Sequence, residues 1–429
     1  MYKFLLCWRY LLSRYIALAS VISVMLGVAT MIVVNAVMLG FTTEMQDRIH
    51  GILSDVIFES RSIDGFPDAE WHMEKIMQVA GDKIEGLTPT VVVPAMMSFQ
   101  TGLNGEVASR PIELVGIDEL TQSKVSQVAA YLQHAENRRQ ISFDLRESGY
   151  DILSQGDPDK AILRNDLRHA GWVYRRTSVA EVEKLRRQIR EEEERLREQH
   201  AALQAAPPTE AGTGDGVTDG ITDGVTDAAT GAADPGNSPE NPSENPFAVA
   251  PSKTDAENVF DPAKEQHTGA IIGIALSQYF RGDVTDPATG ESRIGDSLAL
   301  IPGDDITLTI PMTEIPPKLR HDRFTVVDLY ESKMMEYDSR LVFVPIQKLQ
   351  DLRGMVDPRT GRRMVTQILI KAKPGVNLNE LRDVLQVNFP SHTYNVKTWA
   401  DVQETLLAAV FMEVSILNVL LFLIIAVAG

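Results

Sequence analysis

Residues 16–41 read IALASVISVMLGVATMIVVNAVMLGF, an uncharged run in which Asn35 is the only strongly polar residue. A helix of this length rises about 39 Å, which exceeds the roughly 30 Å hydrocarbon core of a bilayer. The run can therefore cross a membrane with some tilt. We interpret it as the first of two transmembrane helices of a membrane protein.

The charges that flank this run predict its orientation. Lys3, Arg9 and Arg14 precede it, and the first acidic residue of the chain is Glu44. By the positive-inside rule the N-terminus is cytoplasmic, and the following segment is extracytoplasmic. A cleaved signal peptide is the alternative, but its apolar region normally spans about 7 to 15 residues. The length of the run favours a retained anchor in the inner, cytoplasmic membrane.

The composition limits what the exported part of the chain can be. The 429 residues include one cysteine, so an internal disulfide is excluded and the exported part must be held by an ordinary hydrophobic core. The formal net charge of -18 argues against a nucleic-acid partner, because phosphate binding needs clustered Lys and Arg.

After the apolar run the sequence changes to short β-branched stretches separated by Gly, Pro and Asp, which indicates strands. The predicted strands are residues 56–59, 91–97, 112–117, 270–276, 306–310, 324–329, 341–344 and 365–372. Helices are expected over residues 68–79, with Trp71, Ile76 and Val79 as the inner face, and over 120–134, 345–352 and 378–387. This mixture predicts an extracytoplasmic α+β domain.

An insertion divides that domain. The capping-box sequence Ser178–Glu181 predicts the start of a helix, and Glu192 and Gln199 on its apolar seam favour a solvated helix over a short coiled coil. Residues 207–264 repeat Gly-x-Thr-Asp units and contain few apolar residues, which predicts disorder. A calcium-binding repeat would need a Gly-Gly-x-Gly-x-Asp nonapeptide or a twelve-residue loop that ends in Glu, and neither is present.

Residues 406–429, LLAAVFMEVSILNVLLFLIIAVAG, predict the second transmembrane helix. Asn418 lies deep in it, and an intramembrane amide favours hydrogen bonding between helices over a transport site. Because the chain stops at Gly429 inside this run, we expect the sequence to be part of a longer protein.

The expected organisation has five parts. They are residues 1–53 (N-terminus, first transmembrane helix and outward extension), 54–177 (first half of the α+β domain), 178–266 (helical and disordered insertion), 267–405 (second half of the domain) and 406–429 (second transmembrane helix).

Motifs of enzyme chemistry are missing from the sequence. It contains no Gly-x-x-x-x-Gly-Lys-Ser/Thr loop, no Gly-x-Ser-x-Gly elbow and no helical His-x-x-x-His pair. We therefore expect no catalytic residues, no bound cofactor and no metal site.

Several short motifs, taken in their order along the chain, are similar to those of a known protein family. They are Trp8-Arg9-Tyr10, residues 22–29 (ISVMLGVA), 37–41 (VMLGF), 114–118 (LVGID), 272–276 (IGIAL), 303–306 (GDDI), 324–327 (FTVV), Trp399 and 424–428 (IIAVA). In this order they resemble the lipoprotein-releasing ABC transporter permeases of the LolC/LolE type, which belong to the wider FtsX/MacB-like permeases.

The resemblance implies a MacB-like domain between the first and second of four membrane helices, and assembly with a second permease subunit. It also implies a separate ABC ATP-binding subunit (LolD-like) that uses the ATP, contact with membrane lipids, lipoprotein cargo and a periplasmic carrier. In the LolC branch an extended hairpin loop recruits that carrier. The corresponding loop here offers Met312, Ile315, Pro316, Pro317, Lys318 and Arg320, although an ordinary hairpin loop is the alternative.

The functional prediction is a permease subunit that transmits force across the membrane to release lipoproteins. Residues that could pack the membrane helices or form a lateral gate are Met25, Val28, Met31, Asn35 and Asn418. The alternatives are an FtsX-like or MacB-like permease with another cargo and a two-helix membrane sensor.

Overall fold

The computed structural model describes residues 15–52, 54–101, 106–154, 161–205, 260–286, 290, 292–313, 318–357 and 359–428. The chain separates into two compact units, Met1–Arg176 with Lys264–Gly429 and Thr177–Ala263. The low-complexity stretch predicted to be disordered lies almost entirely outside the described residues.

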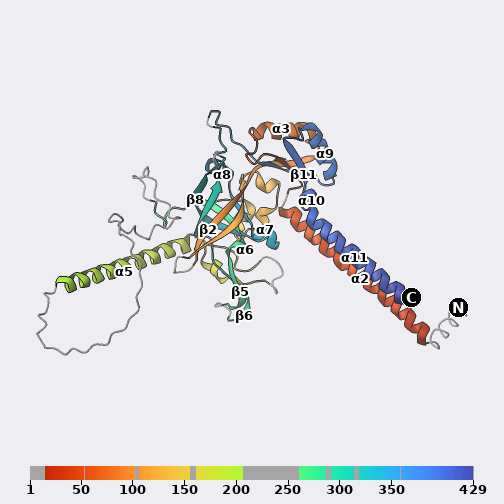
Figure 1. Ribbon diagram of the computed structural model, residues 1–429, viewed down its shortest axis with the longest axis horizontal. Helices are drawn as coiled ribbons and strands as arrows, with labels where there is room; N and C mark the ends of the chain where they lie inside the picture. The colour runs from red at the N-terminus through yellow and green to blue at the C-terminus, as the bar shows by residue number, and fades with distance from the viewer. Residues whose placement is uncertain are drawn as a thin grey trace, which may run out of the picture. The chain divides into compact units, whose positions relative to one another are not determined.

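The described part of the first unit has a long helix at each end (Figure 1). These are α2 (Tyr15–Ile52) and α11 (Glu404–Ala428). Among the described residues one helical segment, Val21–Glu44, has the length and apolar character of a membrane span, and a signal sequence near an N-terminus has the same properties. Between the two helices lies an α+β domain.

One part of this domain is a βαββαβ arrangement whose two halves are far apart in sequence. The first half is β1 (Val56–Ser60), α3 (Ala69–Ala80) and β2 (Ile84–Thr101). The second is β10 (Gln367–Ala372), α9 (Leu378–Asn388) and β11 (Tyr394–Thr398). The antiparallel order is β11-β1-β10-β2, and the helices pack on one face of this sheet through residues such as Phe58, Ile76, Ile370 and Leu385.

A six-stranded barrel is inserted between these halves. The strands β2, β3 (Glu106–Ile117), β9 (Leu341–Pro345), β4 (Thr268–Gly273), β8 (Leu319–Tyr330) and β7 (Asp305–Pro311) pair in that order, and β7 pairs back to β2. Alternate side chains fill the interior, among them Met97, Leu114, Leu308 and Phe324. Strand β2 belongs to both parts, because residues up to Thr90 pair with β10 and those from Val91 pair with β3.

The remaining elements of the first unit cover this framework. Between β3 and β4 lie the 3₁₀ turns η1 (Gln122–Lys124), η2 (Val128–Tyr131) and η4 (Asn165–His169), and α4 (Ala135–Arg139). Later come α6 (Ile274–Ser277), the β5–β6 hairpin (Gln278–Thr285 and Ser292–Leu298), α7 (Met335–Asp338), α8 (Ile346–Arg353) and α10 (Trp399–Val402).

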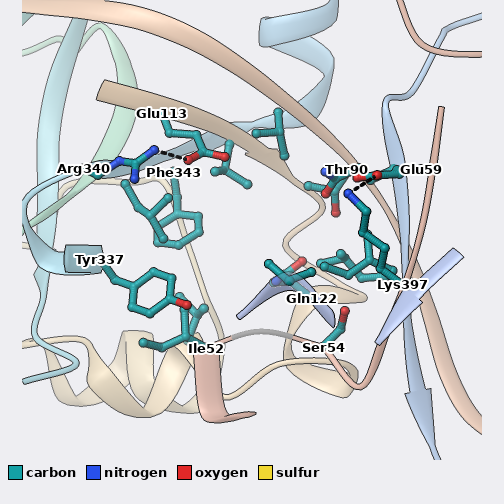
Figure 2. Close-up of a pocket in the computed structure, with 18 of the residues that line it drawn as sticks. Ile52, Ser54, Glu59, Thr90, Glu113, Gln122, Tyr337, Arg340, Phe343 and Lys397 are labelled. Atoms are coloured by element: carbon teal, nitrogen blue, oxygen red, sulfur yellow. Dashed lines mark hydrogen bonds and ion pairs between the residues drawn. The ribbon is translucent and has the colours of Figure 1, made fainter. Parts of the chain in front are cut away.

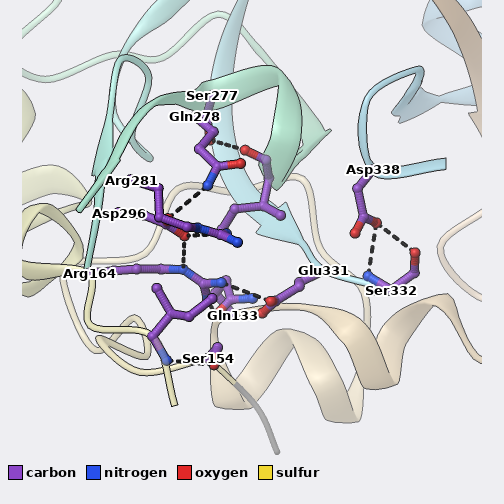
Figure 3. A network of polar contacts seen from close by, with 12 residues as sticks. Gln133, Ser154, Arg164, Ser277, Gln278, Arg281, Asp296, Glu331, Ser332 and Asp338 are labelled. Atoms are coloured by element: carbon purple, nitrogen blue, oxygen red, sulfur yellow. Dashed lines mark hydrogen bonds and ion pairs between the residues drawn. The ribbon is translucent and has the colours of Figure 1, made fainter. Parts of the chain in front are cut away.

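A buried network of charges lies beside the β5–β6 hairpin (Figure 3). The side chain of Arg164 is fully buried and forms ion pairs with Glu331 at 2.9 Å and Asp296 at 3.6 Å. Arg281 and Gln278 of β5 also bind Asp296 of β6, at 2.6 and 2.7 Å. Two guanidinium groups thus compensate two carboxylates whose burial alone would be unfavourable.

Several predicted elements differ in the structure. The α-helix expected over residues 120–134 is replaced by η1 and η2, because Gln127 donates its backbone N–H to Gly51 O at 2.9 Å rather than to a helical turn. The strand predicted over 270–276 ends at Gly273, where a Cβ would lie 2.1 Å from Asp338 O. On α3, Trp71 is 53% exposed, and the neighbouring His72 packs among aromatic rings instead.

The helix predicted to start at Ser178 begins earlier. Helix α5 spans Trp172–Ala205, and Gly171 precedes it with a φ of 100° that favours glycine. Arg175, in its first turn, is buried and forms an ion pair with Asp305 at 2.7 Å. The tertiary contacts of this first turn therefore set the helix start, and the capping-box sequence lies inside the helix.

Candidate functional site

The most distinctive site of the first unit is the junction where the long helices meet the α+β domain. Strand β1 follows α2, strand β11 precedes α11, and the two strands are antiparallel neighbours in which Val56 pairs with Thr398. The start of β1 and the end of β11 therefore lie at the same end of the sheet. Helices α2 and α11 leave from this point and pack side by side (Figure 1).

Asp55 fastens this junction to the sheet. Its buried carboxylate accepts hydrogen bonds from the backbone N–H of Ala372 at 2.7 Å and from Lys371 Nζ at 3.1 Å. Its backbone oxygen accepts from the N–H of Trp399 at 3.1 Å. One residue thus connects the end of α2, the end of β10 and the start of α10, so these three points are held in fixed positions.

The α11 side of the junction is also capped and anchored. Thr398 and Asp401 form a reciprocal capping box on α10, and Arg382 of α9 binds both carboxylate oxygens of Asp401 at 2.9 and 3.1 Å. Gln403 donates from Nε2 to Tyr337 Oη at 2.6 Å, which links the start of α11 to α7. Burial raises the pKa of Tyr337 to about 12, so this phenol is neutral at physiological pH.

The α2 side contacts the segment that covers the barrel. Gly51 lies in the last turn of α2, and its carbonyl oxygen accepts from the N–H of Gln127. A Cβ at this position would lie 2.5 Å from Tyr131 Oη. Only glycine permits this approach without a shift of one partner, so the end of α2 is closely packed against residues 127–131.

A cavity of about 320 Å³ lies at this junction (Figure 2). One wall is the face of the β11-β1-β10-β2 sheet that α3 and α9 do not cover, with Ile57, Leu369 and Thr90. The opposite wall is the outer face of β3 and β9, with Val115 and Phe343. Ile52 at the end of α2 and Gln403 immediately before α11 complete the lining. Any relative movement of the two walls and these two helix ends therefore changes the shape of the cavity.

The charged residues of the cavity form pairs on each wall. Glu59 of β1 pairs with Lys397 of β11 at 2.7 Å and accepts from Asn395 Nδ2 at 3.0 Å. On the opposite wall Arg340 lies 3.4 Å from Glu113 and 3.9 Å from Glu336. Sequence reasoning missed this cavity, since its lining residues come from segments separated by hundreds of positions and form no motif.

The structure divides the five predicted membrane-helix residues into two groups. On α2, half-buried positions recur every three or four residues as Val24, Gly27, Met31, Val34, Asn35, Met38 and Thr42. On α11 the half-buried positions are Leu406, Val410, Val414, Leu417 and Asn418, and Leu407 beside them is buried. This spacing is typical of two helices packed along a shared seam. Met31, Asn35 and Asn418 therefore lie on the seam, whereas Met25 and Val28 lie off it and are exposed.

Asn418 has an unusual environment on this seam. Its Oδ1 is buried and accepts no hydrogen bond within the described part of the chain. An unpaired buried amide is unfavourable in an apolar setting, which is consistent with a role in contacts between helices.

The predicted carrier-binding loop is the connection between β7 and β8. The N–H of Met312 donates to Lys318 O at 2.8 Å, and Arg320 pairs with Ile310 in the ladder. Leu319 is 65% exposed beside them. Ile315, Pro316 and Pro317 lie outside the described residues.

Within the described ranges no group of three or more His, Cys, Asp or Glu side chains could hold a metal ion. In comparisons with known proteins, the chain matches no model of a protein family and no curated protein. The assignment of function therefore depends on the motifs of the sequence and on the geometry of the junction.

Proposed function

We propose that the chain is the transmembrane permease subunit of an ABC transporter that releases lipoproteins from the inner membrane by transmitting force. The observation that supports this proposal most is the junction, where α2 and α11 leave from neighbouring strand ends and are fixed there by the hydrogen bonds of Asp55 and Gln403. In this proposal both helices span the membrane, the N-terminus is cytoplasmic and the α+β domain is extracytoplasmic.

The geometry supports a mechanical role. A LolD-like ATP-binding subunit would hydrolyse ATP on the cytoplasmic side, and its closure in an assembly with a second permease subunit would shift α2 and α11. Because Asp55, Gly51 and Gln403 tie these helices to the sheet, to residues 127–131 and to α7, a shift of either helix is passed to the α+β domain. Such coupling is a rigid-body change of packed elements.

Depletion of the intact protein tests the proposal. We expect lipoproteins to accumulate in the inner membrane, and an ATP-binding subunit to copurify with the protein. Normal sorting of lipoproteins after depletion would reject the release function. Sorting defects without a copurifying ATPase would reject the transporter mechanism.

A two-helix membrane sensor is the second candidate, and the cavity at the junction favours it. Occupancy of a cavity bounded by Ile52 of α2 and Gln403 before α11 would reposition both helices. An FtsX-like or MacB-like permease with another cargo shares the architecture of the first proposal. Further hydrophobic spans beyond Gly429 in the reading frame would favour a permease, whereas a kinase or signalling domain there would favour the sensor.

A further inference from the structure

Two buried polar side chains of the cavity each have one atom that makes no hydrogen bond within the described residues. Thr90, 1% exposed, has an Oγ1 that makes no hydrogen bond among the described residues. Gln122, 2% exposed, donates from Nε2 to Ser126 Oγ at 2.8 Å, which leaves its Oε1 unpaired. Both line the cavity (Figure 2). A buried acceptor of this kind is costly unless a donor reaches it.

The charges around the cavity favour a positively charged donor. Three carboxylates line it, those of Glu59, Glu113 and Glu336, and two cations balance them, Lys397 and Arg340. Arg340 is shared between Glu113 and Glu336, so the lining as a whole has one carboxylate more than it has cations. A ligand that carries one ammonium group would neutralise this excess and supply hydrogen-bond donors.

The rest of the lining is apolar. Ile57 and Leu369 on the sheet wall face the space between the walls, with Val92, Val115 and Phe343 around it. A volume of about 320 Å³ lies within the range of small-molecule sites, in which apolar walls hold the body of a ligand and a few polar groups orient it. Side chains of this type favour an aliphatic or aromatic body.

We propose that this cavity binds an apolar molecule with a single ammonium group. The body lies between the sheet wall and the β3–β9 wall, and the ammonium donates to Gln122 Oε1 and Thr90 Oγ1. This binding does not depend on the transport function, so either proposal can fail without the other.

The test uses 4-phenylbutylamine, 4-phenylbutanol and 4-phenylbutyrate, which share one apolar body and differ in the head group. Each is titrated by calorimetry into the full chain in nanodiscs, with empty nanodiscs as the blank. We expect the amine to bind at least tenfold more tightly than the alcohol, and the carboxylate to bind weakest. Equal binding of the amine and the alcohol would overturn the proposal. Preference for the carboxylate would also overturn it, because the Gln122 amide would then present its Nε2–H group to the ligand instead of Oε1.

Variants locate the binding. Thr90→Val keeps the shape of the side chain and removes the hydroxyl, so the affinity for the amine is expected to fall about tenfold. Gln122→Glu retains an acceptor and adds a charge, so the affinity should rise. Thr307→Val, on β7 outside the cavity lining, is the matched control and should bind as the unmodified chain does. Amine binding that neither Thr90→Val nor Gln122→Glu alters would place the ligand elsewhere and refute the assignment.

Discussion

Replacing Gly51 by alanine should loosen the contact between α2 and the α+β domain. The new Cβ would lie 2.5 Å from Tyr131 Oη and 3.5 Å from Gln127 Oε1. Since an ordinary contact is close to 3.5 Å, the helix end or the tyrosine must move by about 1 Å. Overpacking of this kind costs about 1–3 kcal/mol, and the better helix propensity of alanine offsets about 1 kcal/mol. The expected net loss of stability is therefore about 0–2 kcal/mol.

Two further variants isolate the cause. Gly40 lies on the same helix with nothing within 4 Å of its Cβ position, so Gly40→Ala should keep or raise the stability. The double variant Gly51→Ala with Tyr131→Phe removes the nearest atom and leaves a 3.4 Å contact to the ring. Its loss of stability should therefore be smaller than the sum of the losses of the two single variants.

Thermal unfolding of the full chain in nanodiscs measures these differences, at about 2–4 °C per kcal/mol for a domain of this size. Hydrogen exchange of residues 122–131 reports the local effect, and Gly51→Ala should accelerate it. The reasoning is refuted if Gly51→Ala and Gly40→Ala have the same unfolding midpoint and exchange rates, because the close approach to Tyr131 would then have no energetic consequence.

Other predictions concern buried polar groups. Burial raises the pKa of Asp338 from 3.8 to about 6, so the folded chain binds an extra proton between these values and its stability falls as the pH rises through them. Asp338→Asn keeps an acceptor for Ser332 and removes the carboxylate whose burial is unfavourable when charged. The stability at pH 8 should therefore rise by about 2 kcal/mol and its pH dependence should weaken. Thermal unfolding at pH 5 and pH 8 measures both. Arg164→Ala leaves the buried Glu331 without its cation and should cost about 3–5 kcal/mol, whereas Arg176→Ala, at a half-exposed position, should cost clearly less; equal losses in urea unfolding would contradict this. Thr398→Ala removes the cap of α10 and should cost about 1 kcal/mol and accelerate exchange at residues 399–403, and unchanged exchange there would count against the cap.

The hydrophobic patterns predicted most regular elements. The apolar run at 16–41 lies in α2, and residues 406–428 of the second run lie in α11; the strand runs at 306–310 and 341–344 correspond closely to β7 and β9. The buried side chains of these elements recur at regular intervals along the chain, and such a pattern can be recognised in a single sequence. The closed barrel was not predicted, because the pairing of β2 with β7 joins residues far apart in the chain.

Elements with weak periodicity were missed. The β5–β6 hairpin is held by Arg281, Asp296 and Arg164, and a charged strand of this kind has little apolar alternation. Strand β11 has the polar sequence YNVKT, and it is a strand because it pairs with β1. The helix α5 begins earlier than its capping-box sequence indicates, because tertiary contacts of Arg175 outweigh local preference.

The candidate site was the least predictable part. In the sequence, Gly51 is part of an ordinary helix end and Asp55 part of an ordinary loop. Their roles come from tertiary contacts, of Gly51 with Tyr131 and of Asp55 with Ala372. Thr90 and Gln122 belong to no motif. The orientation of a polar side chain toward a cavity depends on tertiary structure, which a single sequence does not display.

The central claim is that the α+β domain and the N-terminus lie on opposite sides of a membrane. In a Cys7→Ser background, Ser62→Cys places a thiol at an exposed position after β1, and Lys3→Cys places one before α2. A membrane-impermeant maleimide applied to spheroplasts is predicted to label position 62 at once and position 3 only after lysis. Labelling of position 3 with protection of position 62 until lysis would contradict the account.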